Sequence, residues 1–137
     1  MQSVYQDRDG YIWISTRNGL FQYDGYSITT YKSNLYCPDL LSSNNIFCVA
    51  EDSCHRLWIG TYSGLNVLDK RTGEVRKIEN AELSSTGISQ ILVTSDQRIL
   101  FATEIGLYEY KEIDNSFLAY DTSNTGGGFP SHYKVFI

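Results

Sequence analysis

Three groups of side chains in this 137-residue chain have the residue types that catalysis or metal binding needs. The neighbouring Glu51 and Asp52 are a carboxylate pair of the kind used in acid–base catalysis. Cys54 and His55 put a nucleophile beside a base. The stretch 7–10, Asp-Arg-Asp-Gly, has the composition of the start of a calcium-binding loop. Their chemistry depends on the elements that position them.

The elements expected around these groups argue against each chemistry. Neighbouring residues of an extended strand point to opposite faces, so Cys54 and His55 do not form a dyad. A calcium loop would need a bidentate Glu at its twelfth position, where this chain has Asn18. The repeated Asp at the end of the first strand, Asp52 in the second copy, is explained by hydrogen bonds within the turn rather than by catalysis. His132 lies in a linker and has no obvious partner for a metal site. We therefore predict no catalytic residue, no metal site and no cofactor.

Charge and hydropathy argue against two classes of partner. The chain has 11 basic and 16 acidic residues, a net charge of −5, and no basic cluster, which argues against nucleic acid and against an anionic membrane surface. No apolar stretch approaches the roughly 20 residues that span a bilayer, so we expect no membrane contact within this segment. The three cysteines, Cys37, Cys48 and Cys54, leave at least one thiol free.

A repeat runs through the chain. The sequence Thr-x-x-Gly-Leu recurs at Thr16, Thr61 and Thr103, with spacings of 45 and 42 residues. In the first two copies the preceding strand contains Trp-Ile, at Trp13 and Trp58. This period is typical of the four-stranded blade of a β-propeller, and no segment has the 3.6-residue apolar spacing of a helix. Aromatic residues make up 14% of the chain and also favour strands.

Each copy divides into four short strands separated by turns, as in a meander repeated around an axis. We therefore predict an all-β fold, a partial β-propeller of about three four-stranded antiparallel blades plus one further strand. Linkers at 32–44, 79–87 and 121–132 separate the copies. The predicted units form one partial propeller domain, 1–137, with blade 1 at 1–31, blade 2 at 45–78, blade 3 at 87–120 and the first strand of a fourth blade at 133–137.

The connections predict which face of the array binds a ligand. Turns alternate between the two faces of a meander, so the turn after each second strand and the linker after each fourth strand share one face. Binding residues are disproportionately found on loops, and all the long linkers lie on this face. The variable pairs inside the repeated hairpins lie there and supply the candidate ligand-binding residues, Arg17, Asn18, Tyr62, Ser63 and Glu104.

Two interpretations of Trp13 and Trp58 compete. An aromatic face suits a sugar ring, but an aromatic at the same mid-strand position of two copies suits packing between blades. Burial of such a ring contributes about 2–3 kcal/mol, and we favour the packing. Closed propellers have about 4–8 blades, so three blades alone would expose Trp-rich faces. We expect neighbouring propeller blades or self-association to cover them.

The repeat has a family resemblance. The second copy, residues 51–65, resembles the two-component regulator propeller repeat in its Glu-Asp pair, its Leu-Trp-Ile-Gly-Thr strand and its Gly-Leu hairpin. The first copy, residues 7–25, is similar to the same pattern. The third departs most, with Leu-Phe-Ala at 100–102 in place of Trp-Ile-Gly and Thr94 in place of Asp.

The resemblance implies that the chain is part of a larger receptor. Such repeats typically build the periplasmic sensor region of hybrid two-component system proteins in gut Bacteroidetes. The implied function is recognition of glycan fragments, with an oligosaccharide as ligand. The full-length receptor would be a histidine kinase held in the inner membrane, with its signal and transmembrane segments outside this chain. The chain itself is expected not to be an enzyme.

Two alternatives stay open. Propellers also host glycosidases and lyases, which place several carboxylates or a histidine near the central channel. The first strands here offer little beyond Glu51 for that chemistry. Blades can also be purely structural or serve oligomerisation, without a ligand.

Overall fold

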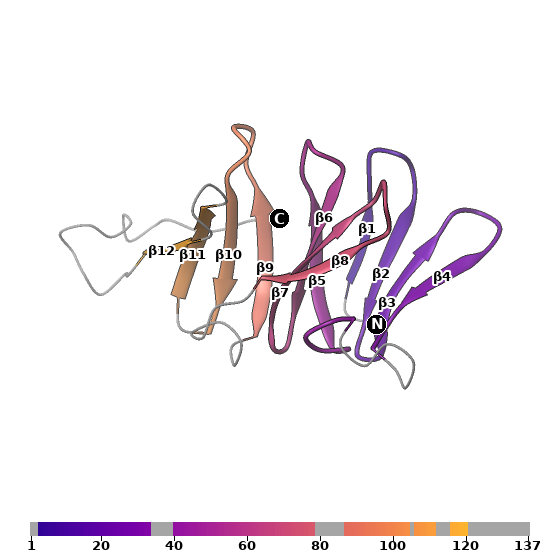
Figure 1. Ribbon diagram of the computed structural model, residues 1–137, viewed down its shortest axis with the longest axis horizontal. Helices are drawn as coiled ribbons and strands as arrows, with labels where there is room; N and C mark the ends of the chain where they lie inside the picture. Colours follow the sequence, from indigo (N-terminus) through magenta and orange to yellow (C-terminus); the bar gives the residue numbers. More distant parts are fainter. Residues whose placement is uncertain (1–2, 34–39, 79–86, 105, 112–115, 121–137) are drawn as a thin grey trace.

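The computed structural model describes residues 3–33, 40–78, 87–104, 106–111 and 116–120. These residues form three four-stranded antiparallel sheets, each with its strands in chain order, which confirms the predicted all-β partial propeller (Figure 1). No helix among them is long and apolar enough to span a membrane. The strands are β1 (Ser3–Gln6), β2 (Ile12–Thr16), β3 (Gly19–Tyr23) and β4 (Ile28–Tyr31) in blade 1, β5 (Ile46–Glu51), β6 (Arg56–Thr61), β7 (Gly64–Asp69) and β8 (Val75–Ile78) in blade 2, and β9 (Ile88–Val93), β10 (Ile99–Thr103), β11 (Gly106–Lys111) and β12 (Ser116–Tyr120) in blade 3.

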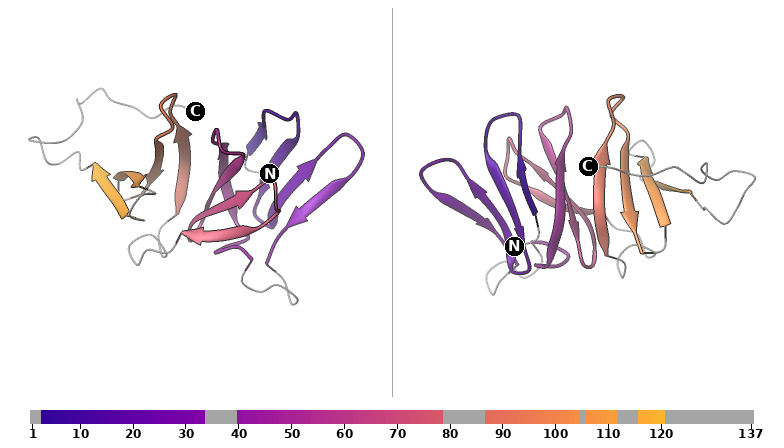
Figure 2. Two further views of the ribbon diagram at one scale, coloured as in Figure 1. Left: turned by 45° about the horizontal axis from the view of Figure 1, so that its top comes forward. Right: turned by 180° about the vertical axis from the view of Figure 1, so that it is seen from behind.

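The three sheets stand side by side in chain order, as the views from the front and from behind both show (Figures 1 and 2). The first strands meet across the seams, because β5 contacts both β1 and β9. The main contacts of β4, β8 and β12 are each with the third strand of their own sheet. The first strands therefore form the inner side of the array, and the fourth strands form its outer edge.

The Thr-x-x-Gly-Leu repeat closes the hairpin between the second and third strands. Thr16 Oγ1 donates to the carbonyl of Gly19 at 2.8 Å and accepts the Asn18 N–H at 2.9 Å. Thr61 and Thr103 donate in the same way, to Gly64 and Gly106, at 2.9 Å. The glycines have positive φ, 113° at Gly19, which favours a residue without Cβ.

Each tryptophan fills the seam between its own blade and the next. Trp13 is fully buried and packs in one cluster with Leu57, Ile59 and Leu68 of blade 2. Trp58 is fully buried in a second cluster that includes Phe101 and Tyr110 of blade 3, with its ring 5.5 Å from that of Tyr110. The prediction of inter-blade packing is confirmed. The expectation of exposed Trp-rich faces is wrong, because both indoles point along the chain toward a blade that is present.

The Gly of Leu-Trp-Ile-Gly-Thr lies where two blades approach most closely. A Cβ added to Gly60 would lie 2.6 Å from Cys48 Sγ and 2.8 Å from Ile88 Cγ2 of blade 3. Real Cβ atoms do not approach other atoms so closely, so Gly is required by packing at this position. The equivalent residue of blade 1 is Ser15, which is fully buried.

The end of the linker at 32–44 lies beside the Thr-Gly hairpins, on the predicted face, whereas residues 34–39, 79–86 and 121–132 of the linkers lie outside the described residues. The Gly19 N–H donates to Asn44 O at 2.7 Å, and the Tyr62 N–H donates to Asn45 O at 3.0 Å. The short turns after β1, β5 and β9 lie on the opposite face, at the upper edge of Figure 1. We call these the linker face and the short-turn face. The strand predicted at 133–137, together with Cys37 and His132, lies outside the described residues.

Candidate functional site

The repeated Asp has a turn role and a second role that sequence reasoning missed. Asp52 Oδ1 accepts the N–H groups of Cys54 at 2.8 Å and Arg56 at 3.1 Å, which confirms the predicted Asx-type turn. Its Oδ2 accepts the indole N–H of Trp58 at 2.8 Å. Asp7 holds Trp13 in the same way, also at 2.8 Å. The common spacing of six residues from Asp to Trp was the signal available in the sequence.

Blade 3 has lost both members of this pair together. Thr94 replaces the Asp and keeps the turn role, because its hydroxyl accepts the Arg98 N–H at 2.9 Å. Phe101 lies one residue beyond the position of the Trp and carries no donor, while Leu100 occupies the position itself. A blade without an indole N–H does not need the second carboxylate oxygen, so the two departures of the third copy have one physical cause.

A buried ion cluster joins blades 1 and 2 on the short-turn face. Lys70 Nζ, from the turn after β7, lies 3.0 Å from Asp7 Oδ2 and 3.0 Å from Asp9 Oδ2, and it also pairs with Glu51. Glu51 accepts the Arg8 N–H at 2.9 Å as well. The side chains of Lys70, Asp7 and Glu51 are 7%, 0% and 2% exposed. Sequence reasoning missed this cluster, because its members lie up to 63 residues apart.

The electrostatics of this cluster favour fixed charges rather than proton transfer. Burial alone would raise the pKa of Asp7, but the hydrogen bonds from Trp13 and Lys70 and the lysine charge lower it below its ordinary value. Burial alone would lower the pKa of Lys70, but hydrogen bonds to Glu51, Asp9 and Asp7 raise it. Oxygens of the three carboxylates lie within 4.8 Å of one another, yet the lysine ammonium lies among them. The cluster therefore cross-links two blades.

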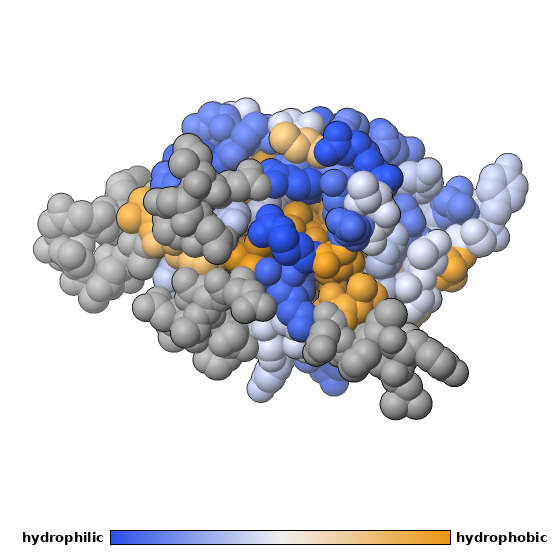
Figure 3. Space-filling model, viewed as in Figure 1, coloured by the Kyte–Doolittle hydropathy of each residue, from blue (hydrophilic) through white to orange (hydrophobic). Residues whose placement is uncertain are grey.

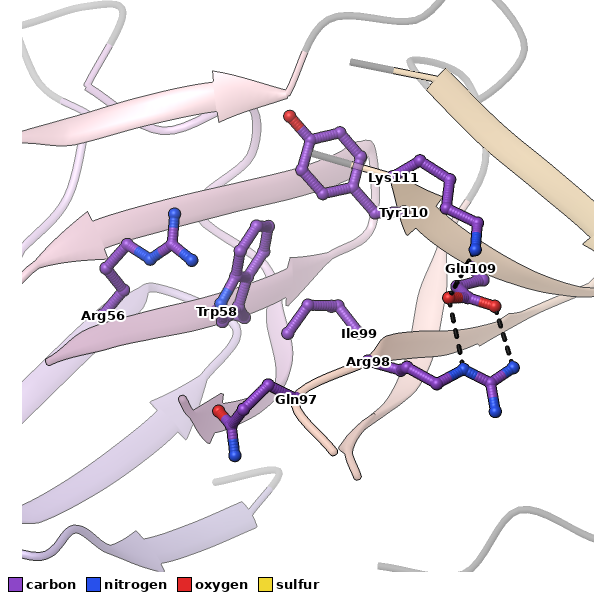
Figure 4. A pocket seen from close by; sticks show the side chains of 8 residues that line it. All are labelled: Arg56, Trp58, Gln97, Arg98, Ile99, Glu109, Tyr110 and Lys111. Atoms are coloured by element: carbon purple, nitrogen blue, oxygen red, sulfur yellow. Dashed lines mark hydrogen bonds and ion pairs between the residues drawn. The ribbon is translucent and has the colours of Figure 1, made fainter. Parts of the chain in front are cut away.

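Between blades 2 and 3 the short-turn face has a hollow of about 190 Å³ (Figure 4). Glu109, whose side chain is 4% exposed, faces Arg98 Nη2 at 2.9 Å and Lys111 Nζ at 3.1 Å. Arg56 pairs with Asp52 at 2.8 Å. The walls of this hollow are thus charged groups that neutralise one another, and the Trp58 ring behind them is fully buried.

A second hollow, of about 260 Å³, follows the inner side of the array. Its lining among the described residues comes from the first strands, with Val4 from β1, Phe47 and Cys48 from β5, and Ser89 and Gln90 from β9. Ser89 and Gln90 are exposed, so the hollow combines apolar walls with an amide and a hydroxyl. The hollow thus places one amide and one hydroxyl beside apolar side chains.

The contacts of two residues near this hollow, Tyr62 and Cys48, show what each side chain does. Phe47, which lines the hollow, packs edge-on against Tyr62 of the linker face, with ring centroids 6.2 Å apart. Cys48 does not act as a nucleophile here. Burial raises the pKa of its thiol to about 12, and the thiol donates to Ile88 O at 3.6 Å.

The candidate residues predicted from the sequence are spread along the linker face. Arg17, Asn18 and Glu104 are exposed at hairpin tips, Ser63 is half-buried, and Tyr62 is 61% exposed. Among the described residues, no hydrogen bond, ion pair or ring contact joins any two of the five. Tyr62 contacts Phe47, which lines the inner hollow, and does not line that hollow itself. Gln90 and Ser89 were missed, because their position depends on how three separate strands converge.

Comparison with known proteins supports the repeat and the fold. A family model described as two component regulator propeller matches residues 1–18 and 40–63. The extracellular domain of a hybrid two component system from B. thetaiotaomicron superposes with a TM-score of 0.78 at 22% identity, over 95% of this chain and 19% of that one. The extracellular domain of a one component system from the same organism gives 0.73 at 23%, over 92% and 17%.

A lyase has the same fold at lower similarity. Virginiamycin B lyase from Staphylococcus aureus superposes with a TM-score of 0.64 at 19% identity, over 90% of this chain and 41% of the lyase. No curated protein matches the chain by sequence. At these identities the structural matches show a shared propeller fold. The chain spans about a fifth of the length of the two extracellular domains.

Proposed function

We propose that this chain, which carries two-component regulator propeller repeats, is part of the extracellular ligand-sensing domain of a signalling receptor. The observation that carries the proposal is the match of the whole blade array to sensor ectodomains, over 95% of this chain in one case. In this proposal the sensing domain lies in the periplasm, and the longer protein is held in the inner membrane and contains a histidine kinase.

The ligand in this proposal is a glycan fragment, bound at the linker-face end of the inner hollow. Tyr62 offers an exposed ring for the apolar face of a sugar, and Phe47 supports that ring from behind. Gln90 supplies an amide, and Ser89, whose hydroxyl donates to Ala102 O at 3.1 Å, supplies an acceptor oxygen for a sugar hydroxyl group. The exposed tips at Arg17, Asn18 and Glu104, with Ser63, remain candidates for outer contacts.

Among the alternatives, the enzyme reading finds little support in the described residues. Glu51, the carboxylate that the first strands offer, is held by Lys70 and by the Arg8 N–H. His55 is exposed in a turn with a φ of 61°, on the face opposite the long linkers. The purely structural reading is favoured by one observation, the buried ion cluster that fixes blade 1 to blade 2.

A binding assay with matched tyrosine variants tests the proposal. Short oligosaccharides, neutral and acidic, are titrated into the purified chain by calorimetry, and into Tyr62→Ala and Tyr26→Ala variants. Tyr26 is 96% exposed in the turn after β3, on the short-turn face, so its removal is the control. We expect binding that Tyr62→Ala weakens about tenfold and Tyr26→Ala leaves unchanged. Absence of binding by every oligosaccharide, or equal loss in both variants, contradicts the proposal.

A further inference from the structure

The two seams between blades have opposite charge balance on the short-turn face. In the first seam three carboxylates, those of Asp7, Asp9 and Glu51, face two cations, Lys70 and Arg8. The Lys70 side chain is 7% exposed, so the carboxylates enclose the ammonium that they share. The first seam is therefore closed by its own charges, with the excess negative.

The second seam has the reverse balance. Two carboxylates, those of Asp52 and Glu109, face three cations. Arg56 pairs with Asp52, whereas Arg98 and Lys111 both pair with Glu109. Figure 4 shows these two cations reaching the same carboxylate from different sides. The described ion pairs around this hollow thus contain one more cation than carboxylates.

The positive groups of the second seam are also its accessible ones. The Glu109 side chain is 4% exposed, but those of Arg98 and Lys111 are 45% and 48% exposed. The Lys111 ammonium has three N–H groups, and its described ion pair is with Glu109 Oε2, at 3.1 Å. A solute that enters the hollow therefore meets the two cations before it meets the buried carboxylate.

The other walls of the hollow are held in place by contacts of their own. The guanidinium carbon of Arg56 lies 5.3 Å from the centroid of the Trp58 ring, and the buried Ile99 lines the hollow beside them. Gln97 of blade 3 spans the seam, because its Oε1 accepts the Ser53 N–H of blade 2 at 2.9 Å. Its amide NH₂ is the group with which it can donate to a ligand.

We propose that this hollow binds the carboxylate group of a small organic acid, beside Glu109 and in contact with Arg98 and Lys111. Charge-assisted hydrogen bonds from these side chains are the strong contacts of a carboxylate. One cation in excess suits a group with a single negative charge. Glu109 stays in place and keeps both cations oriented.

The size and surroundings of the hollow limit the acid further. Sites for drug-sized ligands measure roughly 300–1,000 Å³, so a hollow of about 190 Å³ takes a smaller molecule. The short-turn face, along the upper edge of Figure 3, is mostly hydrophilic, so the rest of the ligand meets polar surroundings. This site lies opposite the linker face, and the inference does not depend on the proposed function.

An NMR titration tests the proposal. Sodium D-glucuronate is added to the ¹⁵N-labelled chain at constant ionic strength, with chloride as the balancing anion, and D-glucose is the uncharged counterpart. We expect saturable amide shifts at residues 97–99 and 109–111, with a Kd of about 1–10 mM, and no saturable shift there with D-glucose. Shifts at residues 46–48 and 88–90 report on the inner hollow separately.

Charge-matched variants separate a site from general attraction. Lys111→Gln and Arg71→Gln each remove one positive charge, but Arg71 does not line the hollow and is 66% exposed. We expect the Kd to rise about tenfold in Lys111→Gln, and by less than about twofold in Arg71→Gln and in Lys111→Arg. Glu109 keeps Arg98 in Lys111→Gln, so this variant should give the amide spectrum of a folded chain.

Three results would overturn the proposal. Equal losses in Lys111→Gln and Arg71→Gln would show general attraction between charges. Shifts that grow without saturation would make the three side chains a solvated ion cluster. Sulfate that binds more tightly than D-glucuronate at the same ionic strength would assign the hollow to a divalent oxyanion.

Discussion

The indole N–H of Trp58 donates to Asp52 Oδ2 at 2.8 Å, six residues away across the turn between β5 and β6. The same carboxylate organises the turn through two backbone N–H groups. One side chain thus joins the turn at the end of a first strand to the side chain that fills the seam. Blade 1 repeats the arrangement with Asp7 and Trp13.

Removal of the Asp52 carboxylate should lower the stability of the folded chain. Asp52→Ala leaves a buried indole N–H without its acceptor and frees two turn N–H groups, so we expect a loss of about 2–3 kcal/mol in the free energy of unfolding, measured with urea. The matched control is Asp24→Ala, because Asp24 caps an exposed turn through the N–H groups of Tyr26 and Ser27. The control should lose under about 1 kcal/mol. Equal losses would show that the indole contact contributes nothing.

The ion cluster predicts how stability changes with pH. The pKa of Asp7 is lowered in the folded chain, so its contribution is present above the unfolded pKa of about 3.9 and is lost as the pH falls below that value. The raised pKa of Lys70 keeps the lysine charged throughout this range. Urea unfolding measured between about pH 6 and 3 should therefore show falling stability.

Lys70→Met removes the shared cation and leaves the carboxylates facing one another. We expect a loss of about 3 kcal/mol at neutral pH, and a partial recovery on acidification as the carboxylates protonate. Arg71→Gln is the control, because the Arg71 side chain is 66% exposed and its Nε lies 3.5 Å from Asp69 Oδ1, a long distance for an ion pair. It should cost under about 0.5 kcal/mol. If Lys70→Met and Arg71→Gln have the same free energy of unfolding, the ion cluster does not stabilise the contact between blades 1 and 2.

Gly60 tests how closely the blades approach. Gly60→Ala places a methyl group against Cys48 and Ile88, so we expect a loss of about 1–3 kcal/mol and a weaker seam between blades 2 and 3. Ser15→Ala is the matched change in blade 1. The buried Ser15 Oγ has no partner within the described parts of the chain, so this variant should keep or gain stability, by up to about 1 kcal/mol. Losses of the same size in both variants would contradict this packing.

The two cysteines that the structure describes should differ in reactivity. Cys48 is buried with a thiol pKa raised to about 12, whereas Cys54 is exposed in the turn after β5. Near pH 8, mass spectrometry after iodoacetamide labelling should find Cys54 modified at least about a hundred times faster than Cys48 in the folded chain. In urea the two rates should converge. Fast native labelling of Cys48 would mean that the seam opens readily.

Most of the fold was predictable from local sequence patterns, whereas the contacts between residues far apart in the sequence were not. Thr16, Thr61 and Thr103 mark hairpins that depend on four consecutive residues, so the repeat located them. The Lys70 cluster depends on two blades whose relative placement no local pattern encodes. The exposed Trp faces were wrongly expected, because the sequence does not say on which side of a blade the indole points.

In the candidate site, too, local sequence patterns predicted some residues, and contacts between distant parts of the chain were missed. Tyr62 was predicted from its place in a variable hairpin, but its contact with Phe47 is a property of the folded seam. Gln90 gave no signal, since a single polar residue on a strand is ordinary until neighbouring strands form a hollow around it. Arg17, Asn18, Ser63 and Glu104 satisfy the positional argument and stay predictions.

The proposed sugar site is the inner hollow beside Phe47, the ring that contacts Tyr62. Amide hydrogen exchange is measured on the purified chain with and without the oligosaccharide that gives the largest calorimetric signal. We predict slower exchange at residues 46–48, 62–63 and 88–90, which surround the linker-face end of the hollow. Slowing confined to the short turns at 52–55 and 94–97, or no slowing at saturating sugar, would contradict it.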